Sequence, residues 1–260
     1  MKRLLRSLIA FVCLVFASAA ASAQTERAEY DGLIKIQQEP SIDTRIQLGE
    51  DFLQKYPNST YGPYVRQQLV YAYNQKKNPD KVIEHGEGAK SVKDVNVLTL
   101  LAIAYGDKKI NDKSLQTAQA ALEVLNGPEA PSNLTPEQKN QSLSLNQYLV
   151  GTAYYRQAKE NQGSEKNALL GKAKESLEAA IHSNPKNDFA YYQLGLTLAE
   201  MSQGTAACEA LAKAVVLEGP AKPIAQQDLE KIYIYYNRKP KAAAAKDLDK
   251  LLAKAKADLK

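Results

Sequence analysis

The sequence has few cysteines and, beyond its N-terminus, no long apolar run. Of its two cysteines, Cys13 lies in the N-terminal segment and Cys208 lies alone far downstream. If that segment is removed, Cys208 has no partner within the chain, so disulfides do not hold the fold. A membrane span needs roughly 20 predominantly apolar residues. No stretch beyond residue 23 is that long, so we expect no stable insertion into a membrane.

Neither sign of charge dominates. The chain has 34 Lys and Arg against 29 Asp and Glu, and three of the basic residues fall within the first six positions. A nucleic-acid-binding domain normally carries a clear basic excess, so we expect no nucleic-acid partner. The remaining excess is concentrated in the Lys-rich stretch 239–260. That stretch could contact anionic lipid or an acidic partner. Its interspersed aspartates and lack of aromatic residues favour instead a solvated helix face, with Ala and Leu packed inward.

The motifs of common catalytic and metal sites are also missing. His85 and His182 are far apart, and neither has a second His or Cys at metal-ligand spacing, so we expect surface or helix-capping positions for both. No nucleophile elbow or phosphate-binding loop is present. The one Gly-x-Gly, at 86–88, is predicted within a helix, as close packing or a local helix fault. The apolar neighbours of Cys208 predict an inert, packed thiol with a raised pKa. We therefore predict no enzyme activity, no metal and no cofactor.

The N-terminus has the three parts of a secretory signal peptide. A positive start with Lys2 and Arg3 is followed by the apolar stretch 8–17 and then by a small-residue site ending at Ala23. The residues before Cys13 do not form a lipobox, so a lipid anchor is not expected. We predict cleavage after Ala23 and a periplasmic or secreted bacterial protein. An uncleaved anchor helix is the alternative.

What the sequence does contain is helix-forming residues interrupted at intervals by turn signals. Ala, Leu, Lys, Gln and Glu dominate, and these residues lose little freedom in a helix. Alternation typical of strands is scarce. Between the turn signals lie segments with helical periodicity, so the sequence predicts an all-α chain. The turn signals are Glu39-Pro40, Tyr56-Pro57-Asn58, Asn78-Pro79-Asp80, Gly127-Pro128, Asn184-Pro185 and Gly219-Pro220.

One segment, 188–221, carries a spaced pattern of small and large apolar residues. The small residues let two helices approach closely, the larger ones fill the seam between them, and turn residues end the second helix. This pattern resembles the tetratricopeptide repeat (TPR), whose repeat length is 34 residues. The residues that carry the resemblance are Leu194-Gly195, Leu198, Ala207, Leu211, Ala214-Val215 and Gly219-Pro220.

The same pattern recurs upstream. Gly151, Ala173 and Leu177 match it with a longer step between the two helices, which extra helix turns or a longer connection around 161–164 would absorb. The resemblance implies a right-handed α–α superhelix, a TPR-like solenoid of antiparallel helix pairs. The expected organisation is a signal peptide at 1–23, an N-terminal helix pair at 24–62, four TPR-like units within 63–221 (63–94, 95–128, 144–187 with the insertion, 188–221) and C-terminal capping helices at 222–260.

The resemblance also implies a concave groove lined by the first helix of each pair. Aromatic residues recur at the corresponding positions of this sequence. Tyr is favoured at binding surfaces because it combines a large apolar body with a polar tip. The alternative is that several of these rings pack between units as ordinary core. The candidate partner-binding residues are Tyr64, Tyr71, Tyr148, Tyr155, Arg156, Phe189 and Tyr192. Arg156 is the one basic residue among the groove positions, so a clamp for a chaperone's C-terminal carboxylate is not expected.

Together these features predict a non-catalytic scaffold or adaptor that binds one or more proteins of the cell envelope. Two other interpretations remain open. The chain could be a structural module that associates with copies of itself, as a homo-oligomer. It could also be a carbohydrate-binding or enzymatic protein built on a helical array.

Overall fold

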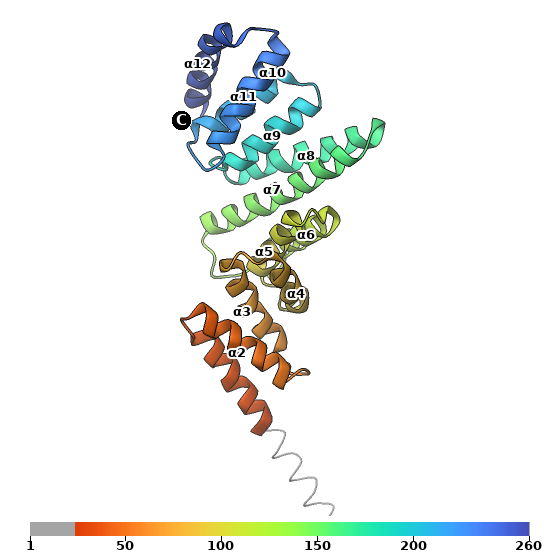
Figure 1. Ribbon diagram of the computed structural model, residues 1–260, viewed down its shortest axis with the longest axis vertical. Helices are drawn as coiled ribbons and strands as arrows, with labels where there is room; N and C mark the ends of the chain where they lie inside the picture. The colour runs from red at the N-terminus through yellow and green to blue at the C-terminus, as the bar shows by residue number, and fades with distance from the viewer. Residues whose placement is uncertain (1–23, 260) are drawn as a thin grey trace, which may run out of the picture. The chain divides into compact units, whose positions relative to one another are not determined.

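The structure, a computed structural model, describes residues 24–259. The predicted signal peptide, 1–23, lies outside the described residues. Within 24–259 every regular element is a helix and none is a strand, so the predicted all-α class is confirmed. The described residues form two compact units, which divide between Lys93 and Asp94. Figure 1 shows the helices of both units.

The first unit is built from residues 24–38, which are helical, followed by further helices joined by short turns. Side-chain caps fix where two of these helices begin: the Ser41 hydroxyl accepts the Thr44 N–H, and the Asn78 side chain accepts the Lys81 N–H. The helices are α2 (Ile42–Lys55), α3 (Gly62–Gln75), α4 (Pro79–Ala89) and the 3₁₀ turn η1 (Lys90–Val92). Residues 24–38, α2 and α3 enclose a core of Leu33, Ile36, Phe52, Val65 and Leu69.

The second unit is a succession of packed helices (Figure 1). Short turns join α5 to α6, α7 to α8 and α9 to α10, so the two helices of each pair run antiparallel. Their bounds are α5 (Val95–Asp107), α6 (Asn111–Asn126), α7 (Pro136–Glu160), α8 (Gly163–Ser183), α9 (Asp188–Glu200), α10 (Gly204–Val216), α11 (Lys222–Asn237) and α12 (Lys241–Asp258).

The same close approach occurs in two of these pairs. A Cβ placed on Gly195 would lie 2.5 Å from Cγ of Leu211, and one placed on Gly151 would lie 2.6 Å from Cγ of Leu177. Only glycine lets the helices come this near. The longer step in the α7–α8 pair is absorbed by extra helix turns, because only residues 161–162 separate the two helices.

The turn inside the pair is repeated as well. Lys77, Lys109 and Ser202 each follow the first helix of a pair and each adopts a left-handed backbone, with φ between 54° and 60°. In each case the N–H of this residue bonds a carbonyl three residues back, and the next N–H bonds a carbonyl five residues back. This hydrogen-bond pattern is the Schellman ending of a helix.

The Lys-rich helix α12 packs on the body of its unit. Ala255 is buried against α10 and α11 in a cluster that also contains Cys208. Three lysines of this region form ion pairs with carboxylates: Lys239 with Asp247, Lys241 with Glu230 and Lys254 with Glu209. The helix therefore has the solvated outer face and inward Ala and Leu that the sequence favoured. Burial raises the pKa of Cys208 to about 11, as its apolar neighbours predicted.

We expected His85 at the surface or at a helix cap, but the structure buries it: the residue is only 1% exposed within the first unit. Its Nε2 lies 3.1 Å from the Glu50 carboxylate, and its ring stacks on Tyr73 with an interplanar angle of 4°. Arg66 Nη1 lies 3.4 Å from Nδ1. Because a guanidinium only donates, the neutral ring donates from Nε2 to Glu50. The prediction failed because nothing local shows that α2, α3 and α4 meet at this residue. The 86–88 Gly-x-Gly lies inside α4, where a Cβ on Gly88 would clash with Arg66, so close packing explains it.

We expect the first unit to lose stability as the pH falls below about 6.5, the ordinary pKa of His. Burial lowers the pKa of His85, and it outweighs the opposing effects of Glu50 and Glu84. The unfolded chain therefore binds the proton more tightly than the folded chain. The contribution of neutral, buried His85 to the stability of the first unit is complete above that pH and is lost on acidification. The measurement is the thermal midpoint of the full chain between pH 7.5 and pH 5.

The matched variants are His85→Gln and His182→Gln, which remove the buried and the exposed histidine respectively. The acid-dependent drop should become smaller in the first variant and remain in the second. Equal pH dependence in the wild type and in both variants would contradict the assignment to His85.

Candidate functional site

Five of the seven candidate residues lie on two helices of the second unit that contact each other, α7 and α9. They are Tyr148, Tyr155 and Arg156 on α7, and Phe189 and Tyr192 on α9. The other two, Tyr64 and Tyr71, lie on α3 of the first unit. Tyr64 is 45% exposed, and Gln67 donates to the Tyr71 hydroxyl at 3.3 Å.

The four aromatic residues of α7 and α9 form what we term the aromatic face: Tyr148, Tyr155, Phe189 and Tyr192. Across the two helices, the Tyr148 and Phe189 rings have centroids 6.1 Å apart and are tilted by 44°, a favourable geometry for an aromatic pair. Phe189 is 41% exposed, whereas the three tyrosines are half-buried. Tyr148 also packs on the core cluster around Leu177 and Leu194. The rings thus contribute to packing and also offer surface.

Two tyrosine hydroxyls of this face stay protonated and so can donate hydrogen bonds. Tyr192 donates to Asp228 of α11 at 2.9 Å, and burial together with that carboxylate raises the pKa of Tyr192 well above its usual value. Burial, with Glu200 nearby, also raises the pKa of Tyr155. Both groups therefore remain protonated at neutral pH. Sequence reasoning missed Asp228, because no local signal shows that α11 reaches this face.

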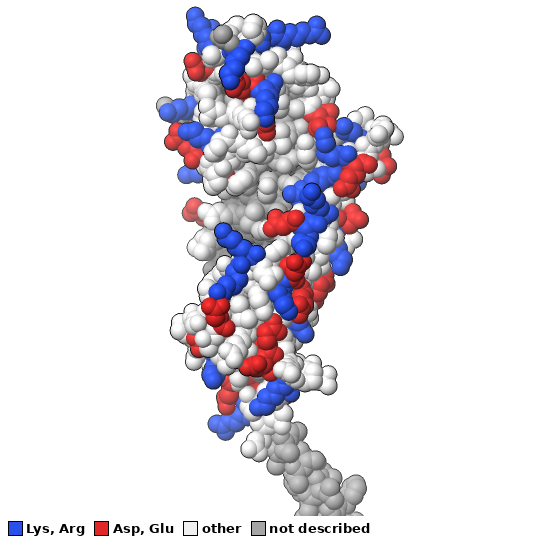
Figure 2. Space-filling model, in the orientation of Figure 1, with Lys and Arg blue, Asp and Glu red and all other residues white. Residues whose placement is uncertain are grey.

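Charged side chains beside the aromatic face are paired. Glu200 accepts hydrogen bonds from Lys159 at 2.6 Å and from Lys166 at 2.8 Å, and both lower its pKa. Arg156 donates from Nη1 to the Gly106 carbonyl at 2.8 Å. Because its guanidinium is used to hold α7 to α5, Arg156 is a poor anchor for a free carboxylate. On the side shown in Figure 2, positive and negative residues are interspersed over the described surface.

Polar contacts near the start of α7 and α9 fix the helices that carry this face. The buried Asp188 carboxylate accepts the Ala221 N–H at 2.7 Å, which ties α9 to the turn before α11. The Ser144 hydroxyl donates to the Ala180 carbonyl at 2.7 Å and accepts from Asn187 at 2.9 Å, which ties α7 to the turn before α9. Both α7 and α9 are therefore positioned by a side chain that bonds to the connection leading to the next first helix.

No protein-family model and no curated protein sequence matches the chain. Solved structures do match. The crystal structure of MamA protein aligns with a TM-score of 0.50 and 19% identity, covering 75% of this chain and 90% of that one. TTC0263, a thermophilic TPR protein of Thermus thermophilus, aligns with a TM-score of 0.50 and 19% identity, covering 74% of this chain and 98% of that one.

The fold is TPR-like. The packed antiparallel pairs, the glycine contacts and these structural matches agree, so the resemblance inferred from the sequence is confirmed. In the TPR-like pairs α5–α6, α7–α8 and α9–α10 the two helices pack closely along their length. The last two helices differ, because α12 packs more extensively on α10 than on α11.

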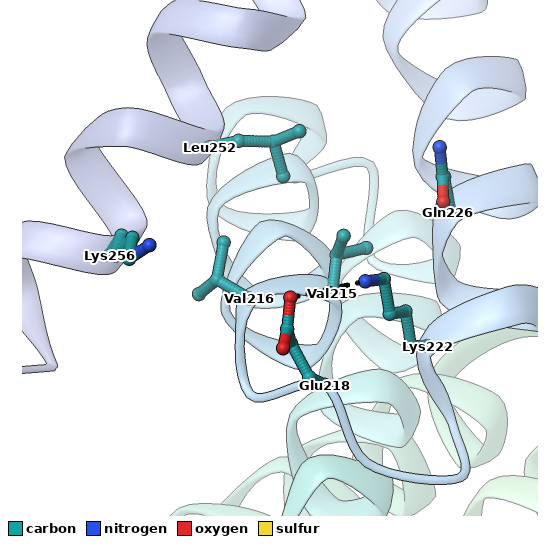
Figure 3. Close-up of a pocket in the computed structure, with 7 residues that line it drawn as sticks. All are labelled: Val215, Val216, Glu218, Lys222, Gln226, Leu252 and Lys256. Carbon is teal, nitrogen blue, oxygen red and sulfur yellow. Dashed lines mark hydrogen bonds and ion pairs between the residues drawn. The ribbon is translucent and has the colours of Figure 1, made fainter.

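This splayed end of the TPR-like array leaves a pocket of about 410 Å³ between α11 and α12, over the C-terminal end of α10 (Figure 3). It is lined by Val215, Val216, Glu218, Lys222, Gln226, Leu252 and Lys256. A second pocket of about 390 Å³ adjoins it at Val216 and Lys256, with Pro185, Lys186, Leu217 and Leu259 as its other lining residues.

Two kinds of site are absent from the described part of the chain. Within residues 24–259, no cluster of three or more His, Cys, Asp or Glu side chains could hold a metal ion. The helices described there include none that combines the length and the apolar character needed to span a bilayer.

Proposed function

We propose that the protein is a non-catalytic scaffold that binds a protein partner through the aromatic face. The observation that carries this proposal is Phe189, which is 41% exposed and packed on Tyr148 of the neighbouring helix. Phe189 therefore offers an exposed ring beside a second aromatic residue, and a few aromatic residues often carry much of the binding energy at protein interfaces. The TPR-like fold adds support, since arrays of helix pairs offer extended surfaces to partners.

The proposal extends to location. A positive start, an apolar stretch and a small-residue site at Ala23 support export from a bacterial cytoplasm, so the partner would be a protein of the cell envelope. The interspersed surface charges and near-balanced composition support a protein partner over nucleic acid.

The test is quantitative co-purification from the envelope fraction of the source cells, with the full chain expressed with its leader as bait. The double variant Tyr148→Ala/Phe189→Ala should reduce recovery of at least one specific protein by about tenfold or more, because truncating central aromatic residues costs roughly 2 kcal/mol or more of binding. The mass of the purified bait checks cleavage after Ala23 in the same experiment.

Tyr235→Ala provides the matched control, because Tyr235 is an exposed aromatic residue on α11, outside the aromatic face. That variant should capture the partner like the wild type. Phe189→Ala alone tests whether weaker capture by the double variant results from lost core packing, since the Phe189 ring is the most exposed of the four. Equal capture by all variants would contradict the proposal. A dimer in solution that Phe189→Ala dissociates would instead favour a self-associating module.

A further inference from the structure

We infer that the pocket between α11 and α12 is a second docking site, which binds a short acidic segment of a partner protein through one apolar side chain and flanking carboxylates. The site shares no residue with the aromatic face. The inference therefore does not rest on the function proposed for that face.

The shape of the site follows from the splayed last helix pair. Val215 and Val216 at the end of α10 form an apolar floor, and Leu252 of α12 forms one wall (Figure 3). The last helix, α12, packs more extensively on α10 than on α11, and the pocket lies in the space that remains between α11 and α12. The volume of about 410 Å³ falls within the roughly 300–1,000 Å³ typical of ligand pockets.

The charge of the site favours an anionic occupant. Lys256 lines both adjoining pockets, and Lys186 lines the second. Lys254, two residues from Lys256 on the same helix, is paired with Glu209, whereas no ion pair joins Lys186 or Lys256 to another described residue. The charge of Lys222 is partly offset by Glu218 at 3.3 Å. The net positive charge beside an apolar floor complements carboxylates next to an apolar side chain.

The polar wall favours a peptide over a lipid. Gln226 offers an amide that both donates and accepts hydrogen bonds, which suits a peptide backbone. An acyl chain needs a continuous apolar channel, whereas here the two pockets expose lysines along their length.

The experiment measures binding of a fluorescein-labelled peptide, Gly-Asp-Glu-Leu-Asp-Glu amide, to the full chain by fluorescence anisotropy. Saturable binding is expected at about 0.01 M salt, and it should weaken strongly toward 1 M because screening shortens from about 30 Å to about 3 Å. The double variant Lys186→Glu/Lys256→Glu should bind at least tenfold more weakly. Lys246→Glu/Lys250→Glu makes the same change in net charge at exposed positions outside the pocket and should bind like the wild type.

A steric variant keeps the test independent of charge. Gln226→Trp fills the pocket from α11 and should abolish binding, whereas Gln227→Trp, at the exposed neighbouring position, should not. Tyr148→Ala/Phe189→Ala should bind the peptide normally, which separates this site from the aromatic face. Equal loss in both lysine variants would overturn the inference, as would absence of peptide binding. Stronger pocket-dependent binding to phosphatidylglycerol vesicles than to the peptide would also overturn it.

Discussion

Replacing Gly195 by valine is expected to lower the free energy of unfolding of the full chain by about 1–3 kcal/mol, through overpacking at the α9–α10 seam. A Cβ at this position would lie 2.5 Å from Leu211 Cγ and 3.1 Å from the Ala207 carbonyl oxygen. Leu211 Cγ is the branch point of its side chain and the Ala207 oxygen belongs to the backbone. Neither atom can therefore move away without displacing its neighbours. Chemical denaturation followed by circular dichroism measures the effect, and the thermal midpoint should fall by roughly 2–4 °C per kcal/mol.

Gly171 supplies the matched control, because it also lies inside a helix, α8, but a Cβ there would meet nothing within 4 Å. Gly171→Ala should therefore stabilise the protein by about 0.5–1 kcal/mol, the usual preference of a helix for alanine over glycine. The two substitutions thus have opposite expected signs. If Gly195→Val left the unfolding midpoint unchanged, the close helix approach would be wrong.

Replacing Asp188 by alanine is expected to cost about 1–3 kcal/mol, the usual penalty for leaving a buried donor without its partner. Asp188 is only 7% exposed, and its carboxylate accepts the Ala221 N–H at 2.7 Å. Asp188→Asn, which retains an acceptor oxygen, should cost less. Asp249→Ala, at an exposed aspartate on α12, should change stability by less than about 0.5 kcal/mol.

Gly219 makes this contact testable by a double-mutant cycle. A Cβ on Gly219 would clash with the Asp188 carboxylate, so Gly219→Ala alone should destabilise the protein. Once Asp188 is alanine, the obstacle is gone and the same substitution should have little further effect. The expected coupling falls in the range of about 0.5–3 kcal/mol seen for residues in contact. Strict additivity of the two free-energy changes would show that the side chains do not meet.

Local chemistry explains why much of the fold was predictable. Helix propensity and turn residues indicated the α-helical class, and the spaced small residues indicated close helix pairs. Gly151 and Gly195 make those approaches in the structure, because their role depends on a spacing within one pair. The inert character of Cys208 followed likewise from its immediate neighbours, which lie on the same helix turn.

The errors and omissions concern contacts between distant segments. His85 was expected at the surface, yet it is buried by Glu50 and Arg66 from two other helices. The hydrogen bond from Tyr192 to Asp228 joins residues on α9 and α11, and neither position marks the other in the sequence. The pocket lined by Lys256 depends on how α12 packs against α10 and α11, and no local sequence pattern indicates this packing.

The amino-acid sequence alone determined which segments are helical, where their turns fall and which positions must be small, because propensity, capping and the spacing of one helix pair are short-range properties. Only the tertiary structure decided which tyrosines share a surface, which histidine is buried and where a pocket remains between the last two helices. These depend on how separate helices pack, and the packing free energy is a sum over contacts between residues far apart in the chain.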